Sequence, residues 1–142
     1  MRSFFGLLFA LALSMTGGDA LAQITDLNVA INKAGRQRML SQRMGKFYQA
    51  IAWGVGDEKS AGELAKARKE FTAAHQELAA APSNTVQIKE GLDLVKQQWL
   101  FFENALGLKA GPDKRPQTAV ATNSERILEE METIVGQYEK LK

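Results

Sequence analysis

Apolar residues recur at alternating intervals of three and four along most of the chain, which is the pattern of amphipathic helices. The third of four such segments shows it most clearly, with Ile88, Leu92, Val95, Trp99, Phe102 and Leu106. The segments are expected to span about residues 25–53, 58–81, 85–108, and from a loop at 111–116 to the C-terminus. Because the connecting loops are short, the pattern predicts an all-α, antiparallel up-down-up-down four-helix bundle.

Residues that favour helix ends mark the expected boundaries of these helices. The expected N-caps are Thr25 or Asp26 for the first helix, Asp57 for the second, and Ser83 or Asn84 for the third. The expected stops are the glycines at 54 and 56, then Pro82, then the two-proline loop at 111–116.

The first 22 residues have the features of a secretory signal peptide. Arg2 provides a positive start, residues 4–15 form an apolar run, and Ala20-Leu21-Ala22 is a small-x-small cleavage signature. The apolar run is shorter than the roughly 20 residues that a membrane-spanning helix needs, so cleavage near Ala22 is expected rather than an uncleaved anchor. The domain is then residues 23–142, and its expected location is the periplasm.

Few side chains in this sequence can carry reactive chemistry. The chain has no cysteine, which excludes disulfides and thiolate sites, and His75 is its one histidine. No motif supports a multi-histidine metal site, a haem or a catalytic nucleophile. We therefore expect no metal, no cofactor and no enzyme activity. Nucleic-acid binding would suit a basic helix, but the expected export argues against that partner.

The first predicted helix is basic, although the formal net charge of the whole chain is only +2. No acidic residue occurs between Asp26 and Asp57, and this interval contains Lys33, Arg36, Arg38, Arg43 and Lys46. Carboxylates one turn away usually neutralise such charges on a solvated helix, and this helix has none. The segment is therefore the strongest candidate for a binding site.

A helical projection divides this segment into two faces. One face groups Leu40, Met44, Phe47 and Ile51, which are expected to enter the bundle core. The roughly opposite face groups Leu27, Ile31, Ala34, Gly35, Arg38, Ser41, Gln42, Gly45 and Ala52. Because small residues allow close helix approach, this second face predicts a homodimer interface. The other basic side chains are expected to be ordinary surface charges, except Lys33, which falls toward the core side.

Arg38 lies near the centre of the small-residue face, so a two-fold dimer would bring it close to its own copy. Two guanidinium groups repel each other, and a bound anion between them reverses the sign of the interaction. The planar donor fork of arginine suits small oxyanions. The pattern therefore predicts a dimer that an anion stabilises.

The run from Ile31 to Met44 resembles the opening helix of the PilJ-type domain, the N-terminal sensing domain of type IV pili methyl-accepting chemotaxis transducers. It is also similar to the periplasmic signature of nitrate and nitrite sensor kinases. The matching residues are Asn32, Gly35, Arg38, Met39, Ser41 and Arg43.

The resemblance implies that a small anion, with nitrate or nitrite as candidates, binds at the dimer axis between paired first helices. It makes Arg38 the main ligand, with backbone groups around Ala34 and Gly35 contributing and Lys33 assisting in some members. Further candidate supporting residues are Asn32, Ser41, Gln42 and Arg43.

Relatives of this type are usually transmembrane receptors with a signalling output, whereas this sequence contains no second apolar segment, kinase or methyl-accepting helix. Anion binding is therefore expected rather than direct signalling, in an exported domain that could report to a membrane receptor. The alternative is a periplasmic interaction protein that pairs with a PilJ-type receptor without binding an anion.

Overall fold

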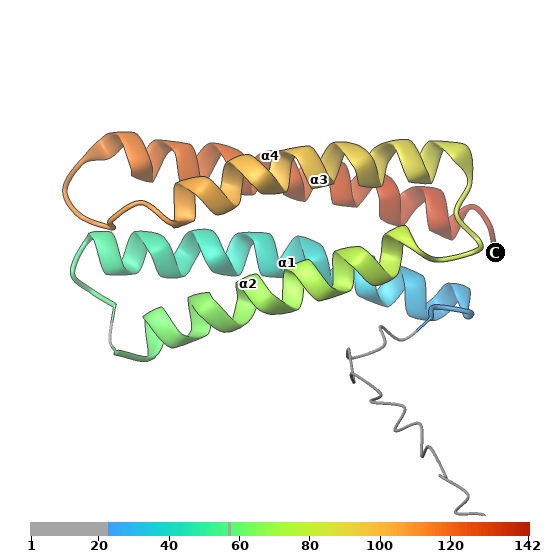
Figure 1. Cartoon of the computed structure of the whole chain (residues 1–142), viewed down its shortest axis with the longest axis horizontal. Coiled ribbons are helices and arrows are strands. Elements are labelled where there is room, and N and C mark those ends of the chain that lie inside the picture. The colour runs from blue at the N-terminus through green and yellow to red at the C-terminus, as the bar shows by residue number, and fades with distance from the viewer. Residues whose placement is uncertain (1–22, 57) are drawn as a thin grey trace, which may run out of the picture.

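The computed structural model describes residues 23–56 and 58–142, which form four long helices. α1 spans Leu27–Ala52, α2 spans Glu58–Ala79, α3 spans Val86–Leu106 and α4 spans Lys114–Glu139 (Figure 1). Successive helices run in opposite directions, so the predicted all-α up-down-up-down bundle is confirmed. The expected signal peptide and the expected cap Asp57 lie outside the described residues.

The two ends of α1 agree with the prediction. Asp26 caps the helix, because its side chain accepts a hydrogen bond of 2.7 Å from the backbone N–H of Asn28. The chain leaves α1 through Gly54, whose φ of 69° lies in the left-handed region that favours glycine.

The starts of α3 and α4 differ from the prediction. Thr85, rather than Ser83 or Asn84, caps α3, and its hydroxyl accepts a hydrogen bond of 3.2 Å from the first turn. Asn84 is buried, and its amide donates a hydrogen bond of 2.7 Å to a carbonyl near the end of α2. Pro116 lies in the first turn of α4 and not in the preceding loop. Proline is tolerated there because the first N–H groups of a helix have no acceptor within it.

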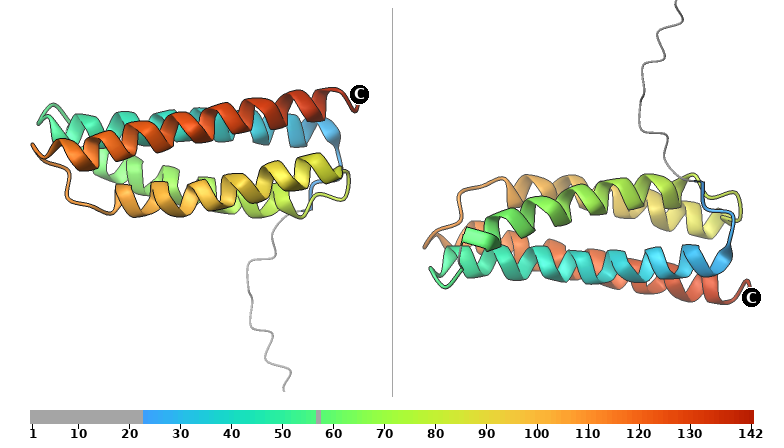
Figure 2. Two further views of the ribbon diagram at one scale, coloured as in Figure 1. Left: turned by 90° about the horizontal axis from the view of Figure 1, so that it is seen from above. Right: turned by 90° about the horizontal axis from the view of Figure 1, so that it is seen from below.

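The four helices do not pack equally. α1 packs along both α2 and α4, and α3 packs along α4, whereas the adjacent helices α2 and α3 contact each other only sparsely. Figure 2 shows α1 and α4 lying side by side along the bundle. The start of α1 and the end of α4 therefore lie at the same end of the molecule (Figure 1).

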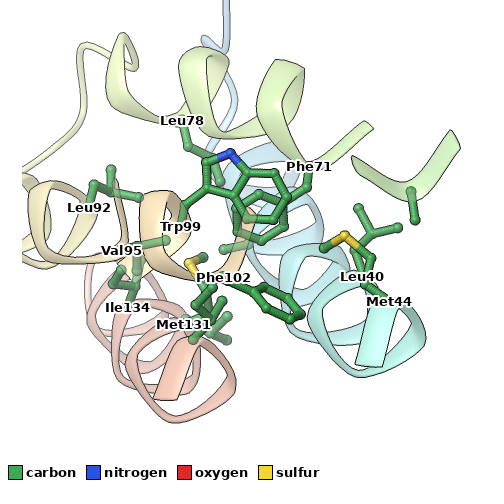
Figure 3. Packing of buried hydrophobic residues seen from close by; sticks show 14 of the residues in the cluster. Leu40, Met44, Phe71, Leu78, Leu92, Val95, Trp99, Phe102, Met131 and Ile134 are labelled. Atoms are coloured by element: carbon green, nitrogen blue, oxygen red, sulfur yellow. The ribbon is translucent and has the colours of Figure 1, made fainter. Parts of the chain in front are cut away.

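A single apolar core runs between the helices (Figure 3). The ring centroid of Trp99 lies 4.4 Å from that of Phe71 and 5.9 Å from that of Phe102. Of the residues predicted to enter the core from α1, Leu40 and Met44 are buried. Phe47 and Ile51, also predicted, are only partly buried at its edge.

Candidate functional site

Three of the basic residues on α1 pair with glutamates on α2. The pairs are Lys33–Glu77, Arg36–Glu70 at 2.8 Å and Arg43–Glu63 at 2.7 Å. The three glutamates are seven residues apart, so they lie along one side of α2. Arg36 and Arg43 are surface residues as expected, but α2 supplies the carboxylates that α1 lacks.

Arg38 differs from these three cations because it points toward α4. Its Nη1 lies 3.7 Å from a carboxylate oxygen of Glu132, which is beyond hydrogen-bond distance. The Arg38 side chain is 37% exposed, and that of Glu132 is 57% exposed. Among the described residues, Arg38 is therefore a cation with its donors largely unoccupied.

The guanidinium group of Arg38 lies over Gly35, one turn earlier on α1. A Cβ built on Gly35 would lie 3.7 Å from Nη2 of Arg38, which is ordinary van der Waals contact. These two predicted site residues are thus adjacent. A glycine at this position also leaves the surface beside the guanidinium group low enough for another chain to approach.

Lys33 and Arg38 lie on different flanks of α1. They are five positions apart, which places their side chains about 140° apart around the helix axis. Lys33 faces α2 through its ion pair with Glu77, whereas Arg38 faces α4. Within one chain the structure therefore does not bring the two predicted ligands together.

The prediction that the small residues of α1 form a dimer face is wrong, because these residues pack inside the bundle. Ala34, Ser41 and Gly45 are buried in the single chain. The hydroxyl of Ser124 on α4 donates a hydrogen bond of 3.1 Å to the Ser41 carbonyl. A Cβ on Gly45 would lie only 3.1 Å from Oγ of Ser124. Close approach of helices is indeed the role of these residues, but the approaching helix is α4 of the same chain.

A second stripe follows the outer surface of α1 at intervals of four, three, four, three and four residues. It consists of Asn28, Asn32, Gly35, Met39, Gln42 and Lys46, which we call the outer stripe. All of these residues are exposed except Gly35, which is half-buried. This spacing follows one face of the helix, and Met39 is the one large apolar residue on it. Arg38 lies on the α4 flank of this stripe.

Of the remaining predicted supporting residues, two lie on the outer stripe and one lies on the α2 flank of α1. Asn32 and Gln42 belong to the outer stripe, although the Gln42 amide also lies 3.2 Å from Oγ of Ser124. Arg43 points toward α2, and its guanidinium carbon lies 5.3 Å from the ring centroid of Phe47. Arg43 is therefore not adjacent to Arg38 in one chain.

Gln37 is a residue of the same segment whose position the sequence did not reveal. Its side chain is fully buried, and its amide nitrogen donates a hydrogen bond of 2.9 Å to the Phe71 carbonyl. A buried glutamine costs free energy unless it is hydrogen-bonded, so this contact fixes the rotation of α1 on α2. Its place directly before Arg38 means that this rotation also sets the direction of Arg38.

His75 of α2 is buried, and its ring packs on the side of α2 that faces α3. Its ring is nearly parallel to that of Phe71, with a centroid separation of 6.4 Å. Burial lowers the pKa of His75, and the positive charge of Lys96 lowers it further, against a smaller opposing effect of Asp93. The neutral imidazole is therefore the stable form in the folded protein at neutral pH.

The residues at 23–56 and 58–142 include no group of three or more His, Asp or Glu side chains that could hold a metal ion. Within the same residues, no helix is both long and apolar enough to cross a membrane.

The family model for the N-terminal domain of type IV pili methyl-accepting chemotaxis transducers, named PilJ, matches residues 20–127. No curated protein and no solved structure matches the chain. The matched range contains α1, α2, α3 and the first half of α4, including Arg38 and the outer stripe.

Proposed function

The chain belongs to the PilJ family of transducer N-terminal sensing domains, and we propose that it binds a small oxyanion, with nitrate or nitrite as the first candidates. In this proposal two copies pair through α1, and the anion lies between their Arg38 side chains. The proposed location is the periplasm, after removal of the first 22 residues.

The observation that carries the proposal is the difference between Arg38 and its neighbours. Arg36 and Arg43 each have a carboxylate oxygen within 2.8 Å, whereas the nearest carboxylate to Arg38 is at 3.7 Å. An anion that bound at Arg36 or Arg43 would have to displace a hydrogen-bonded glutamate. An anion at Arg38 displaces only a longer and more exposed contact with Glu132, which is worth little.

Pairing through the outer stripe would bring the two anion ligands to one place. Arg38 flanks the stripe, so its long side chain can reach across a helix pair toward the second copy. Gly35 removes a side chain where the two backbones would approach. Without an anion, two guanidinium groups at this position repel each other, so anion binding and dimer formation are coupled.

The chemistry of the guanidinium group favours a planar oxyanion. Arginine presents parallel N–H donors in one plane, and nitrate and nitrite each offer two oxygens that can accept them together. Lys33 is neutralised by Glu77 on the other flank of α1, so the proposed site relies on Arg38 and the backbone around Gly35.

The proposal is tested by sedimentation of residues 23–142 with and without nitrate. Nitrate and nitrite should increase the dimer fraction, and equal concentrations of chloride should have less effect. Arg38→Ala should remove this response and retain the helical circular dichroism spectrum. The matched control is Arg36→Ala, which removes a cation two residues away on the α2 flank and should keep the response.

The second candidate function uses the same outer stripe without an anion. Five of its six residues are uncharged, so the stripe could pair with α1 of a separate PilJ-type membrane receptor. Comparing Met39→Glu with Arg38→Ala distinguishes the two functions. Receptor pairing alone requires Met39 but not Arg38, whereas the anion proposal requires both.

A further inference from the structure

The outer face of α3 exposes large apolar side chains that nothing in the described chain covers. Leu94 is 42% exposed, Leu100 is 62% exposed and Phe101 is 69% exposed. Leu108, just after the end of the helix, is also exposed. We call these four residues the α3 patch. α3 packs along α4 and only sparsely along α2, so the patch lies away from α1 and its outer stripe.

The size of the α3 patch is unusual for a surface that remains in water. Its exposed apolar area is on the order of 400 Å², which is comparable to the largest patches on soluble monomers, and such patches are often functional. Leu94, Phe101 and Leu108 are spaced by seven residues, and Gln97 and Asn104 lie between them. On the helix, Leu94 and Phe101 therefore share one face, and the polar residues Gln97 and Asn104 share it with them.

Charged residues at the edge of the patch favour a particular partner and orientation. Lys96 and Glu103 are seven residues apart, so they lie on the same edge of α3. On this edge Arg68 of α2 lies 3.5 Å from the Glu103 carboxylate, and the Glu103 side chain is still 41% exposed. In an antiparallel pair of α3 helices centred near Leu100, Lys96 of each copy lies near Glu103 of the other. In a parallel pair, the two copies of this edge would lie on opposite sides of the contact, so Lys96 and Glu103 would not meet across it.

We infer that the α3 patch is a second self-association surface, on which α3 of another copy packs antiparallel about a two-fold axis near Leu100. The occupant is a second copy because the edge charges complement their own two-fold image, and because the centre of the surface is uncharged. Two patches and their polar surroundings together bury on the order of 1,000 Å², which is the lower limit for a specific interface and predicts a weak dimer.

The inference does not rest on the proposed anion site, since it uses a different helix on the other side of the bundle. If both surfaces operate, each chain has two separate two-fold contacts. Such chains form assemblies larger than a dimer when nitrate is present.

Cysteine cross-linking tests the geometry directly, because the natural chain contains no cysteine. Leu100→Cys in residues 23–142 should form a disulfide-linked dimer under mild oxidation. The matched control is Glu125→Cys, at an exposed position on α4, which should cross-link at least tenfold more slowly. Equal rates for the two variants would overturn the inference.

Sedimentation of charge variants tests the orientation. Phe101→Glu should raise the dimer dissociation constant at least tenfold with an unchanged helical spectrum, because Phe101 is exposed in the monomer. Lys96→Glu should weaken the dimer, and adding Glu103→Lys to it should restore the dimer. A wild-type protein that stays monomeric without anion at millimolar concentration would contradict the proposed surface. A double variant that dimerises no more tightly than Lys96→Glu would contradict the antiparallel pairing.

The same experiments separate this inference from the anion proposal. Arg38→Ala should leave the cross-link at position 100 unchanged. Loss of nitrate binding with a retained cross-link would contradict only the anion site. Retained nitrate binding without the cross-link would contradict only the α3 surface.

Discussion

The hydroxyl of Tyr138 donates a hydrogen bond of 2.6 Å to Oδ1 of Asn84, which joins the end of α4 to the loop between α2 and α3. Both side chains are buried, and the amide of Asn84 also donates to the Leu78 carbonyl. These two hydrogen bonds of Asn84 therefore join the loop to α4 and to the end of α2, and they fix the start of α3 over the core.

Tyr138→Phe should lower the free energy of unfolding by about 1–3 kcal/mol, because it leaves Oδ1 of Asn84 buried without a donor. Urea denaturation measures this change. Thr133→Val is a suitable control, since that hydroxyl is exposed and bonds only within its own helix. An equal loss in the two variants would argue against a specific role for the Tyr138 contact.

Tyr138 should also make the fold sensitive to alkaline pH. Burial raises the pKa of Tyr138 from 10.0 to about 12. Between these values the unfolded chain loses the phenolic proton and the folded chain keeps it, so stability is full below pH 10 and falls as the pH rises toward 12. In Tyr138→Phe, this component of the alkaline loss should disappear from the pH profile of the melting temperature.

Two glycines on α1 should respond in opposite ways to alanine. Gly45→Ala places a methyl group 3.1 Å from Oγ of Ser124, so it should push α4 away and destabilise the fold by about 1–3 kcal/mol. Gly35→Ala meets nothing closer than 3.7 Å and should stabilise the isolated chain by up to about 1 kcal/mol through helix propensity.

Gly35→Ala should nevertheless weaken the nitrate-dependent dimer, because the new methyl group stands between the paired helices. Thermal unfolding and sedimentation of the same variant separate these effects. A variant that is both stable and fully responsive to nitrate would exclude close approach of a second helix at Gly35.

His75 should make the fold sensitive to acid. Burial lowers the pKa of His75 below its ordinary value of 6.5, so the unfolded chain binds a proton at a higher pH than the folded chain. The contribution of neutral His75 is complete above pH 6.5 and is lost as the pH falls below that value. His75→Gln should flatten the stability profile between pH 7.5 and 5.5. A profile identical to that of the wild type would contradict this origin.

Glu132→Gln should increase nitrate affinity, because it removes the carboxylate that competes with the anion for Arg38. The increase should be at most about fivefold, since an exposed ion pair contributes about 0.2–1 kcal/mol. Glu129→Gln is the matched control, because Glu129 is exposed on the same helix and one turn earlier. An equal effect of both substitutions would indicate a general change of charge and not competition at Arg38.

The helices and the central core could be predicted from the sequence because both depend on local patterns. Leu92, Val95 and Trp99 repeat at helical spacing, and all three are buried. The spacing alone gives the face of α3 that enters the core. Thr85 was missed as a cap because Asn84, equally suited by residue type, is used in a contact with Tyr138, a residue 54 positions away.

The details of α1 could not be predicted because they depend on other helices. Glu70, which pairs with Arg36, is 34 residues away, and no pattern within α1 indicates it. The small residue Gly45 was correctly interpreted as a site of close helix approach, but the sequence could not say whether the approaching helix belonged to the same chain. The outer stripe is the exposed face of α1 because Ala34, Ser41 and Gly45 are buried inside the bundle.

Calorimetric titration of nitrate into residues 23–142 tests the central proposal most directly, because it measures both affinity and stoichiometry. An anion shared between two Arg38 side chains requires one nitrate for every two chains, with Arg36→Ala unchanged and Arg38→Ala showing no binding heat. A ratio of one nitrate per chain, binding retained in Arg38→Ala, or no wild-type binding of nitrate or nitrite would contradict a shared anion site on α1.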